Sequence, residues 1–107
     1  MLATLRPPPV HTKPIIVSYM SEGLLIRKVT PAYPQIAMVA RQQGTVLLHA
    51  IIGRDGTIQQ LQAVSGPPLL IKAAMDAVAQ WRYRPYVLNG QPVEVDTQIT
   101  VNFKLGG

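Results

Sequence analysis

The feature that most constrains the fold is a strict two-residue alternation near the end of the chain. In residues 93–105, Val, Ile, Phe, Leu or Thr occupies every second position, and polar side chains fill the positions between them. Successive side chains of a strand point to opposite faces, so the pattern predicts a long strand with one buried and one solvated face. The ten prolines and eight glycines also argue against an all-α fold.

The rest of the chain predicts a short strand, a helix, a β-hairpin and a second helix. Asp55-Gly56 is a strong hairpin signal, because this pair accepts the positive φ of a tight turn. An apolar stripe at helical spacing predicts an amphipathic helix that lies on a sheet. In chain order, we expect a short strand at residues 23–29, a helix at 34–40, hairpin strands at 45–52 and 57–65, and a helix at 69–83; residues 15–19 favour a strand but are isolated.

This order of elements predicts an α+β fold, a small antiparallel three-stranded sheet packed against two helices, with a possible short N-terminal strand. The simplest sheet places residues 93–105 beside the first hairpin strand, so that this strand lies in the middle. The length of 107 residues suits one small domain. We expect a proline-rich flexible tail at residues 1–22 and the domain at 23–107, with its core around Leu48, Ala50, Leu61, Ile71, Met75, Val78 and Trp81.

The predicted final strand lies at an edge of this sheet, where its unpaired N–H and C=O groups face outward. Such an edge either receives a partner peptide as an additional strand or is covered. The cover could come from residues 23–29, from the N-terminal tail or from a second copy of the chain. The candidate partner-binding residues are Val95, Asp96, Thr97, Gln98, Ile99, Thr100, Val101, Asn102 and Phe103.

The composition argues against an enzyme and against a metal or cofactor site. The chain has no cysteine, which excludes disulfides, thiolate ligands and a cysteine nucleophile. His11 lies in the proline-rich segment, and His49 lies within a predicted strand among apolar residues. Glu94 and Asp96 share a solvated strand face, without the apolar surroundings that would give two carboxylates different acid–base roles. No glycine-rich phosphate-binding motif is present, so we expect no catalytic residue, no metal and no cofactor.

The net charge of +5 raises the possibility of nucleic-acid binding, because ten basic residues stand against five acidic ones. Most of the basic residues are scattered along the chain, without a basic stripe or an aromatic ladder for stacking bases. Arg82 and Arg84 close the predicted second helix, where cations suit the helix dipole. We therefore expect no nucleic-acid partner.

An ordered set of short motifs resembles the C-terminal domain of the TonB family of energy transducers. The resemblance covers about three-quarters of the chain, and its most specific part is the run that follows the amphipathic helix. The motifs are Tyr33-Pro34, Gly44, Asp55-Gly56, Val64-Ser65-Gly66, Ala77-Val78, Trp81-Arg82-Tyr83-Arg84-Pro85 and Gly90-Gln91-Pro92-Val93, with a final strand through Phe103.

The resemblance implies a periplasmic, receptor-binding domain of an inner-membrane-anchored protein. Such a domain binds the TonB box of outer-membrane transporters by strand addition, and thereby couples the inner-membrane proton-motive force to uptake of iron chelates and other solutes. ExbB and ExbD would bind to segments outside this chain. The membrane anchor would be another such segment. Tyr33 and Pro34 would lie near the box, and Arg82 and Arg84 are further candidate contacts. The alternative is a structural module for another envelope system, with the same edge paired in a homodimer.

Overall fold

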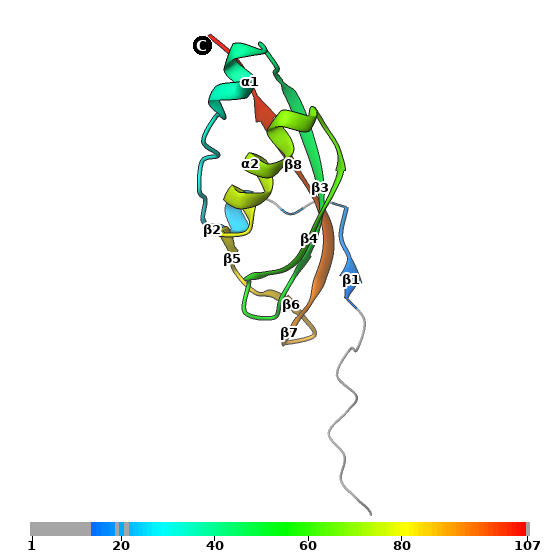
Figure 1. Ribbon diagram of the computed structural model, residues 1–107. Helices are drawn as coiled ribbons and strands as arrows, with labels where there is room; N and C mark the ends of the chain where they lie inside the picture. The colour runs from blue at the N-terminus through cyan, green and yellow to red at the C-terminus, as the bar shows by residue number, and fades with distance from the viewer. Residues whose placement is uncertain (1–13, 19, 21, 107) are drawn as a thin grey trace, which may run out of the picture.

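A computed structural model describes residues 14–18, 20 and 22–106, and its centre is a four-stranded sheet (Figure 1). The strand order is β1-β8-β3-β4. The central strand β3 (Gly44–Ile52) pairs antiparallel with both β4 (Ile58–Ser65) and β8 (Val95–Phe103). The predicted three-stranded sheet and its strand order are therefore confirmed, and β1 (Ile15–Ile16), which runs parallel to β8, makes the sheet mixed.

Alternating side chains explain why β3 and β8 lie at the centre of the domain. On β3, Val46, Leu48 and Ala50 are fully buried, whereas the residues between them are less buried or exposed. On β8 every odd-numbered residue is buried, and four of these five are apolar. The two strands pair without a break from Gly44 opposite Phe103 to Ile52 opposite Val95, so their buried faces form one continuous apolar surface.

Two helices cover this apolar face of the sheet (Figure 1). Helix α1 (Gln35–Val39) begins after Pro34, and α2 (Pro68–Val78) begins after Pro67, at positions where a missing N–H group costs no helical hydrogen bond. Leu70, Ala74 and Val78 of α2 are fully buried. Among the described residues, neither helix has the length and apolar character needed to cross a membrane.

Helix α2 ends at Val78, five residues before the end of the helix that was predicted from the apolar stripe. The following residues enter a second small sheet, in which β5 (Arg82–Tyr83) pairs antiparallel with β2 (Leu25–Arg27). The Tyr83 N–H donates to the Gly56 carbonyl over 2.9 Å, and Trp81 Nε1 donates to the Val29 carbonyl over 2.8 Å. These long-range hydrogen bonds compete with continuation of the helix, and local periodicity does not reveal them.

The remaining elements are short. A 3₁₀ turn, η1 (Glu22–Leu24), leads directly into β2. The hairpin of β6 (Tyr86–Leu88) and β7 (Gln91–Val93) turns at Asn89 and Gly90, which have φ values of 51° and 80°. Two consecutive positive φ values are typical of a type I′ turn, in which Asn-Gly is the favoured pair.

The core lies between the sheet and the helices, and most of it is aliphatic. Of the predicted core positions, Leu48, Ala50, Val78 and Trp81 are buried. The other three predicted positions are partly buried and pack against this cluster; they are Leu61, Ile71 and Met75.

The segment before residue 23 contributes to the folded domain in the part that the structure describes. Residues 1–13 of the expected tail lie outside the described residues. Ile15 and Ile16 form β1, and Met20 is buried in the core with an exposed fraction of 6%. A domain boundary at residue 22 therefore leaves out two segments that contact the domain. The strand expected at residues 23–29 became β2, which joins the small sheet rather than the main one.

Candidate partner-binding edge

The edge of β8 is only partly covered. The N–H groups of Ile15 and Val17 donate to the carbonyls of Glu94 and Asp96, each over 2.9 Å. Since the N–H and C=O groups of one strand residue point to the same side, the even-numbered residues of β8 direct their peptide groups away from β3. By the same alternation, Gln98, Thr100 and Asn102 also point outward. We call these three residues the open edge, because no described strand pairs with β8 on the side to which their peptide groups point.

The predicted binding strand is therefore divided by the structure into two parts. Its first residues, Val95 and Asp96, pair with β1, whereas the open edge follows from Gln98 onward. The signal for this cover was present in the sequence as the β-branched run Ile15-Ile16-Val17. The N-terminal tail was one of three possible covers of this edge, and the sequence could not choose among them, because parallel pairing across about 80 residues leaves no local pattern.

Side chains beside the edge tie β8 to β3 on the solvated face of the sheet. Asp96 Oδ1 lies 2.5 Å from His49 Nε2, and an ionised carboxylate only accepts, so the imidazole N–H is the donor. At the other end of the strand, Thr45 Oγ1 donates to Asn102 Oδ1 over 2.6 Å. These contacts hold the strand in register from both ends without using the outward peptide groups.

A small hollow of about 150 Å³ adjoins the open edge on the buried side of the sheet. Gln98, Ile99 and Thr100 form one wall of it. The opposite wall comes from Met20, Leu25, Lys28, Trp81 and Tyr83, and the Lys28 ammonium lies 5.7 Å from the centre of the Trp81 ring. A strand added to β8 would direct alternate side chains toward this side, where the hollow has room for one small apolar group.

The structure brings one of the four further candidate residues to β8. The Tyr33 ring meets the Phe103 ring edge-on, with 5.4 Å between centroids, and its hydroxyl donates to the Gln42 carbonyl. Pro34 directly precedes α1.

The two arginines flank buried Tyr83 and are themselves exposed. Arg82 lies opposite Thr57, beside the turn between β3 and β4. There the Thr57 hydroxyl and N–H hold the pKa of Asp55 below its usual range, with a smaller contribution from Arg82. The Arg84 backbone N–H donates to the Leu24 carbonyl over 2.6 Å. Arg82 lies in β5 and Arg84 directly follows that strand, so neither closes α2, and the expectation that both lie at a helix end was wrong.

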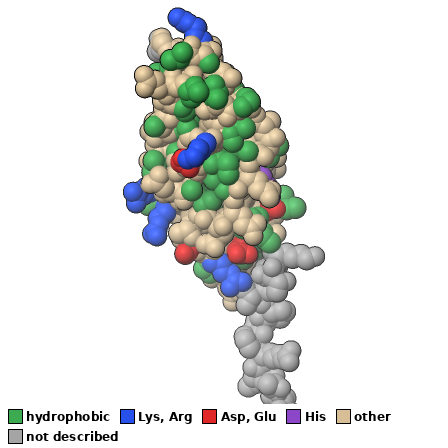
Figure 2. Space-filling view, viewed as in Figure 1, with side chains coloured by type: hydrophobic (Ala, Val, Ile, Leu, Met, Phe, Trp, Pro, Cys, Tyr) green, Lys and Arg blue, Asp and Glu red, His purple; other side chains and the backbone are tan. Residues whose placement is uncertain are grey.

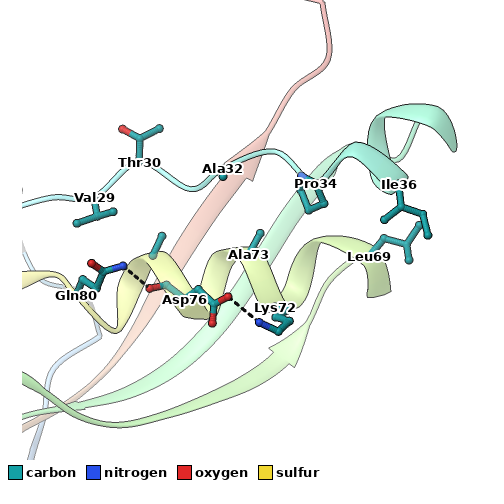
Figure 3. A pocket seen from close by; sticks show the side chains of 11 residues that line it. Val29, Thr30, Ala32, Pro34, Ile36, Leu69, Lys72, Ala73, Asp76 and Gln80 are labelled. Atoms are coloured by element: carbon teal, nitrogen blue, oxygen red, sulfur yellow. Dashed lines mark hydrogen bonds and ion pairs between the residues drawn. The ribbon is translucent and has the colours of Figure 1, made fainter.

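An apolar groove of about 520 Å³ lies on the helical side of the domain, away from the paired strands (Figure 3). The extended segment from Val29 to Pro34 forms one wall, and α2 forms the other. Lys72 and Asp76 project from α2 at its rim, where they form an exposed ion pair of 3.0 Å. Figure 2 shows hydrophobic side chains spread over this face, with the lysines and arginines dispersed rather than gathered into one patch.

The described residues offer main-chain groups rather than a reactive centre. No three His, Asp or Glu side chains within residues 14–18, 20 and 22–106 are grouped so that they could hold a metal ion. The chemistry available at the open edge is thus hydrogen bonding by peptide groups, next to a small apolar hollow.

Comparison with known proteins places this arrangement among related domains. Residues 29–105 match the family model described as Gram-negative bacterial TonB protein C-terminal. The chain is 34% identical over 100 residues to Protein TonB of Vibrio cholerae, a match that covers 92% of this chain and 40% of that protein. It is 32% identical over 84 residues to Protein TonB of Klebsiella pneumoniae, covering 77% of this chain and 32% of that protein. The chain thus spans about two-fifths or less of the length of these curated relatives.

Two solved structures share the fold. The solution NMR structure of the Pseudomonas aeruginosa TonB C-terminal domain superimposes with a TM-score of 0.64 and 27% identity, covering 78% of this chain and 86% of that one. The TonB2 protein of Vibrio anguillarum gives a TM-score of 0.60 and 25% identity, covering 94% of this chain and all of that one (100%).

Proposed function

Because this chain belongs to the family of TonB C-terminal domains, which are non-enzymatic, we propose that it binds the TonB box of an outer-membrane transporter at the open edge of β8. The box adds to the sheet as an extended strand. Main-chain hydrogen bonds supply most of the affinity, and side chains at alternate positions of the box supply specificity.

The single observation that carries this proposal is the set of outward peptide groups at Gln98, Thr100 and Asn102. These groups belong to a long, regular strand whose other side pairs with β3 without a break. A partner strand would therefore meet a template that is already ordered, and binding would cost little conformational entropy on the side of the domain.

In the whole protein, we propose that this domain lies in the periplasm and acts as the receptor-contacting end of an energy transducer. Segments outside this chain would anchor it in the inner membrane and contact ExbB and ExbD. Movement driven by the proton-motive force would then reach the transporter through the added strand.

The test is a titration of the domain with a synthetic TonB-box peptide, followed by amide chemical shifts. The largest changes should fall on residues 98–102. In a second arm, Thr100→Pro removes one outward donor, which an edge strand tolerates, and should weaken peptide binding about tenfold. Thr100→Ala is the matched control, because it shortens the side chain but keeps the N–H group. Largest shifts on α2, or equal affinities for both variants, would refute strand addition at this edge.

A second candidate function uses the same observation. The open edge could pair with a second copy of the chain and make the domain a dimerisation module for another envelope system. Sedimentation at several protein concentrations separates the two candidates. A stable dimer without affinity for the peptide would favour the module, whereas a monomer that binds the peptide would favour the receptor-contacting domain.

A further inference from the structure

We propose that β1 is a displaceable strap, which competes with the partner strand for the first half of the β8 edge. This inference rests on the proposed function, because it concerns access to the same edge. The strap is the segment from Ile15 to Val17, whose described backbone bonds to the edge go to the carbonyls of Glu94 and Asp96.

The strap limits the length of strand that can be added to the sheet. With β1 in place, the outward peptide groups available to a partner are those of Gln98, Thr100 and Asn102. When β1 leaves, the groups of Glu94 and Asp96 join them, and the available template extends along the whole strand. An extended peptide that pairs with all of β8 must therefore displace β1, whichever direction the peptide runs.

The contact between β1 and β8 is small enough to be exchanged. It is a parallel pairing of only two residues, to which Ile15 and Val17 each donate one hydrogen bond of 2.9 Å, whereas β3 pairs with nine residues of β8. Ile16 is 81% exposed and adds little apolar burial.

The strap is anchored at one end, which keeps it close to the edge after it lifts. Met20 is buried in the core cluster together with Trp81, and it also lines the hollow beside Gln98 and Thr100. Val17 packs partly against the same cluster. Release of β1 therefore breaks its short backbone pairing with β8 and the Val17 contact, while β3, β8 and the Met20 anchor keep their positions. The tethered strap remains at a high effective concentration and can close again when the partner leaves.

Competition of this kind makes the observed affinity equal to the intrinsic affinity multiplied by the fraction of molecules in which the edge is fully open. The two bonds that the strap donates, at an ordinary net strength of about 1 kcal/mol each, correspond to about thirtyfold in that fraction. A partner that pairs along the whole strand should experience this reduction.

The test compares proline variants of the full chain. Ile15→Pro combined with Val17→Pro removes both donors of the strap. The matched control is Ile16→Pro, whose N–H points away from β8, so that it stiffens the segment without removing either bond. With a synthetic TonB-box peptide long enough to pair along all of β8, the double variant should bind about thirtyfold more tightly than the control and the natural sequence.

A second measurement uses the natural sequence alone and does not depend on the folding of a variant. Hydrogen exchange should show protected Ile15 and Val17 amides in the free protein and loss of this protection at saturating peptide. If residues 98–102 respond to the peptide but the Ile15 and Val17 amides stay protected and the affinities are equal, the strap is refuted and the proposed function stands. If no residue of β8 responds in any variant, both are refuted.

Discussion

Gly56 is the position where one added methyl group should damage the fold most clearly. Its φ is +84°, and a Cβ built there would lie 1.8 Å from the Tyr83 carbonyl oxygen and 2.8 Å from the Tyr83 carbonyl carbon. Both atoms belong to the backbone, so no side-chain rotation relieves the contact. Gly56→Ala should therefore push β5 away from the turn between β3 and β4.

The cost of Gly56→Ala has two separable parts. An L-residue in the left-handed region costs about 1 to 2 kcal/mol, partly offset by the lower entropy of the unfolded chain. Displacing Tyr83 also breaks the 2.9 Å hydrogen bond from its N–H to the Gly56 carbonyl and strains the packing of a buried side chain. Together these two effects cost about 2 to 4 kcal/mol. We expect a total loss of about 4 kcal/mol, a large share of the stability of a small domain.

Gly90→Ala is the matched control for this prediction. Gly90 has a nearly identical φ of +80°, but a Cβ there meets no atom within 4 Å. Gly90→Ala should therefore lower the free energy of unfolding only through the cost of the left-handed backbone conformation, by about 1 kcal/mol. Urea unfolding of both variants can be followed by the fluorescence of Trp81, the single tryptophan. Equal losses of unfolding free energy would show that contact with Tyr83 does not matter and would refute the reasoning.

Two further predictions concern polar groups. Thr97 is 2% exposed, and its hydroxyl finds no hydrogen-bond partner among the described residues, so Thr97→Val should raise the unfolding free energy in urea by about 1 kcal/mol; an unchanged or lower value would contradict this. The Asp55 pKa is lowered by the Thr57 hydroxyl and N–H, so the folded state favours the ionised carboxylate. Its stabilising effect should be present above the ordinary carboxyl range and lost as the pH falls through the lowered pKa. The stability advantage over Asp55→Asn should accordingly shrink in acid, and a pH-independent difference would contradict the assignment.

The strand pairing at the centre of the sheet could be predicted because its causes are local. The alternation along residues 93–105 identified β8 and its buried face, and Asp55-Gly56 identified the hairpin of β3 and β4. The register of β8 against β3 then places the buried side chains of both strands on one side. A shift by one residue would turn all of them toward water, so the hydrophobic pattern alone nearly determines this pairing.

The end of α2 could not be predicted, because distant groups decide it. The apolar stripe continues to Trp81, and the predicted helix extends to Tyr83. In the folded chain, Trp81 donates to Val29 and Tyr83 donates to Gly56, more than 25 residues away in each case. Those partners exist only once the hairpin and the segment before α1 are in place, and they convert the last predicted turn of helix into β5.

The candidate site also has one part that the sequence predicts and another that only the folded structure shows. The sequence by itself determined that β8 is a long edge strand with one face in the core, because side-chain alternation depends only on the order of residues along the chain. It did not determine how much of that edge is free. Only the tertiary structure decided that Ile15 and Val17 cover the carbonyls of Glu94 and Asp96 and leave Gln98, Thr100 and Asn102 open. The physical reason is that a parallel pair joins segments about 80 residues apart through main-chain groups, which every residue carries and no side-chain pattern records.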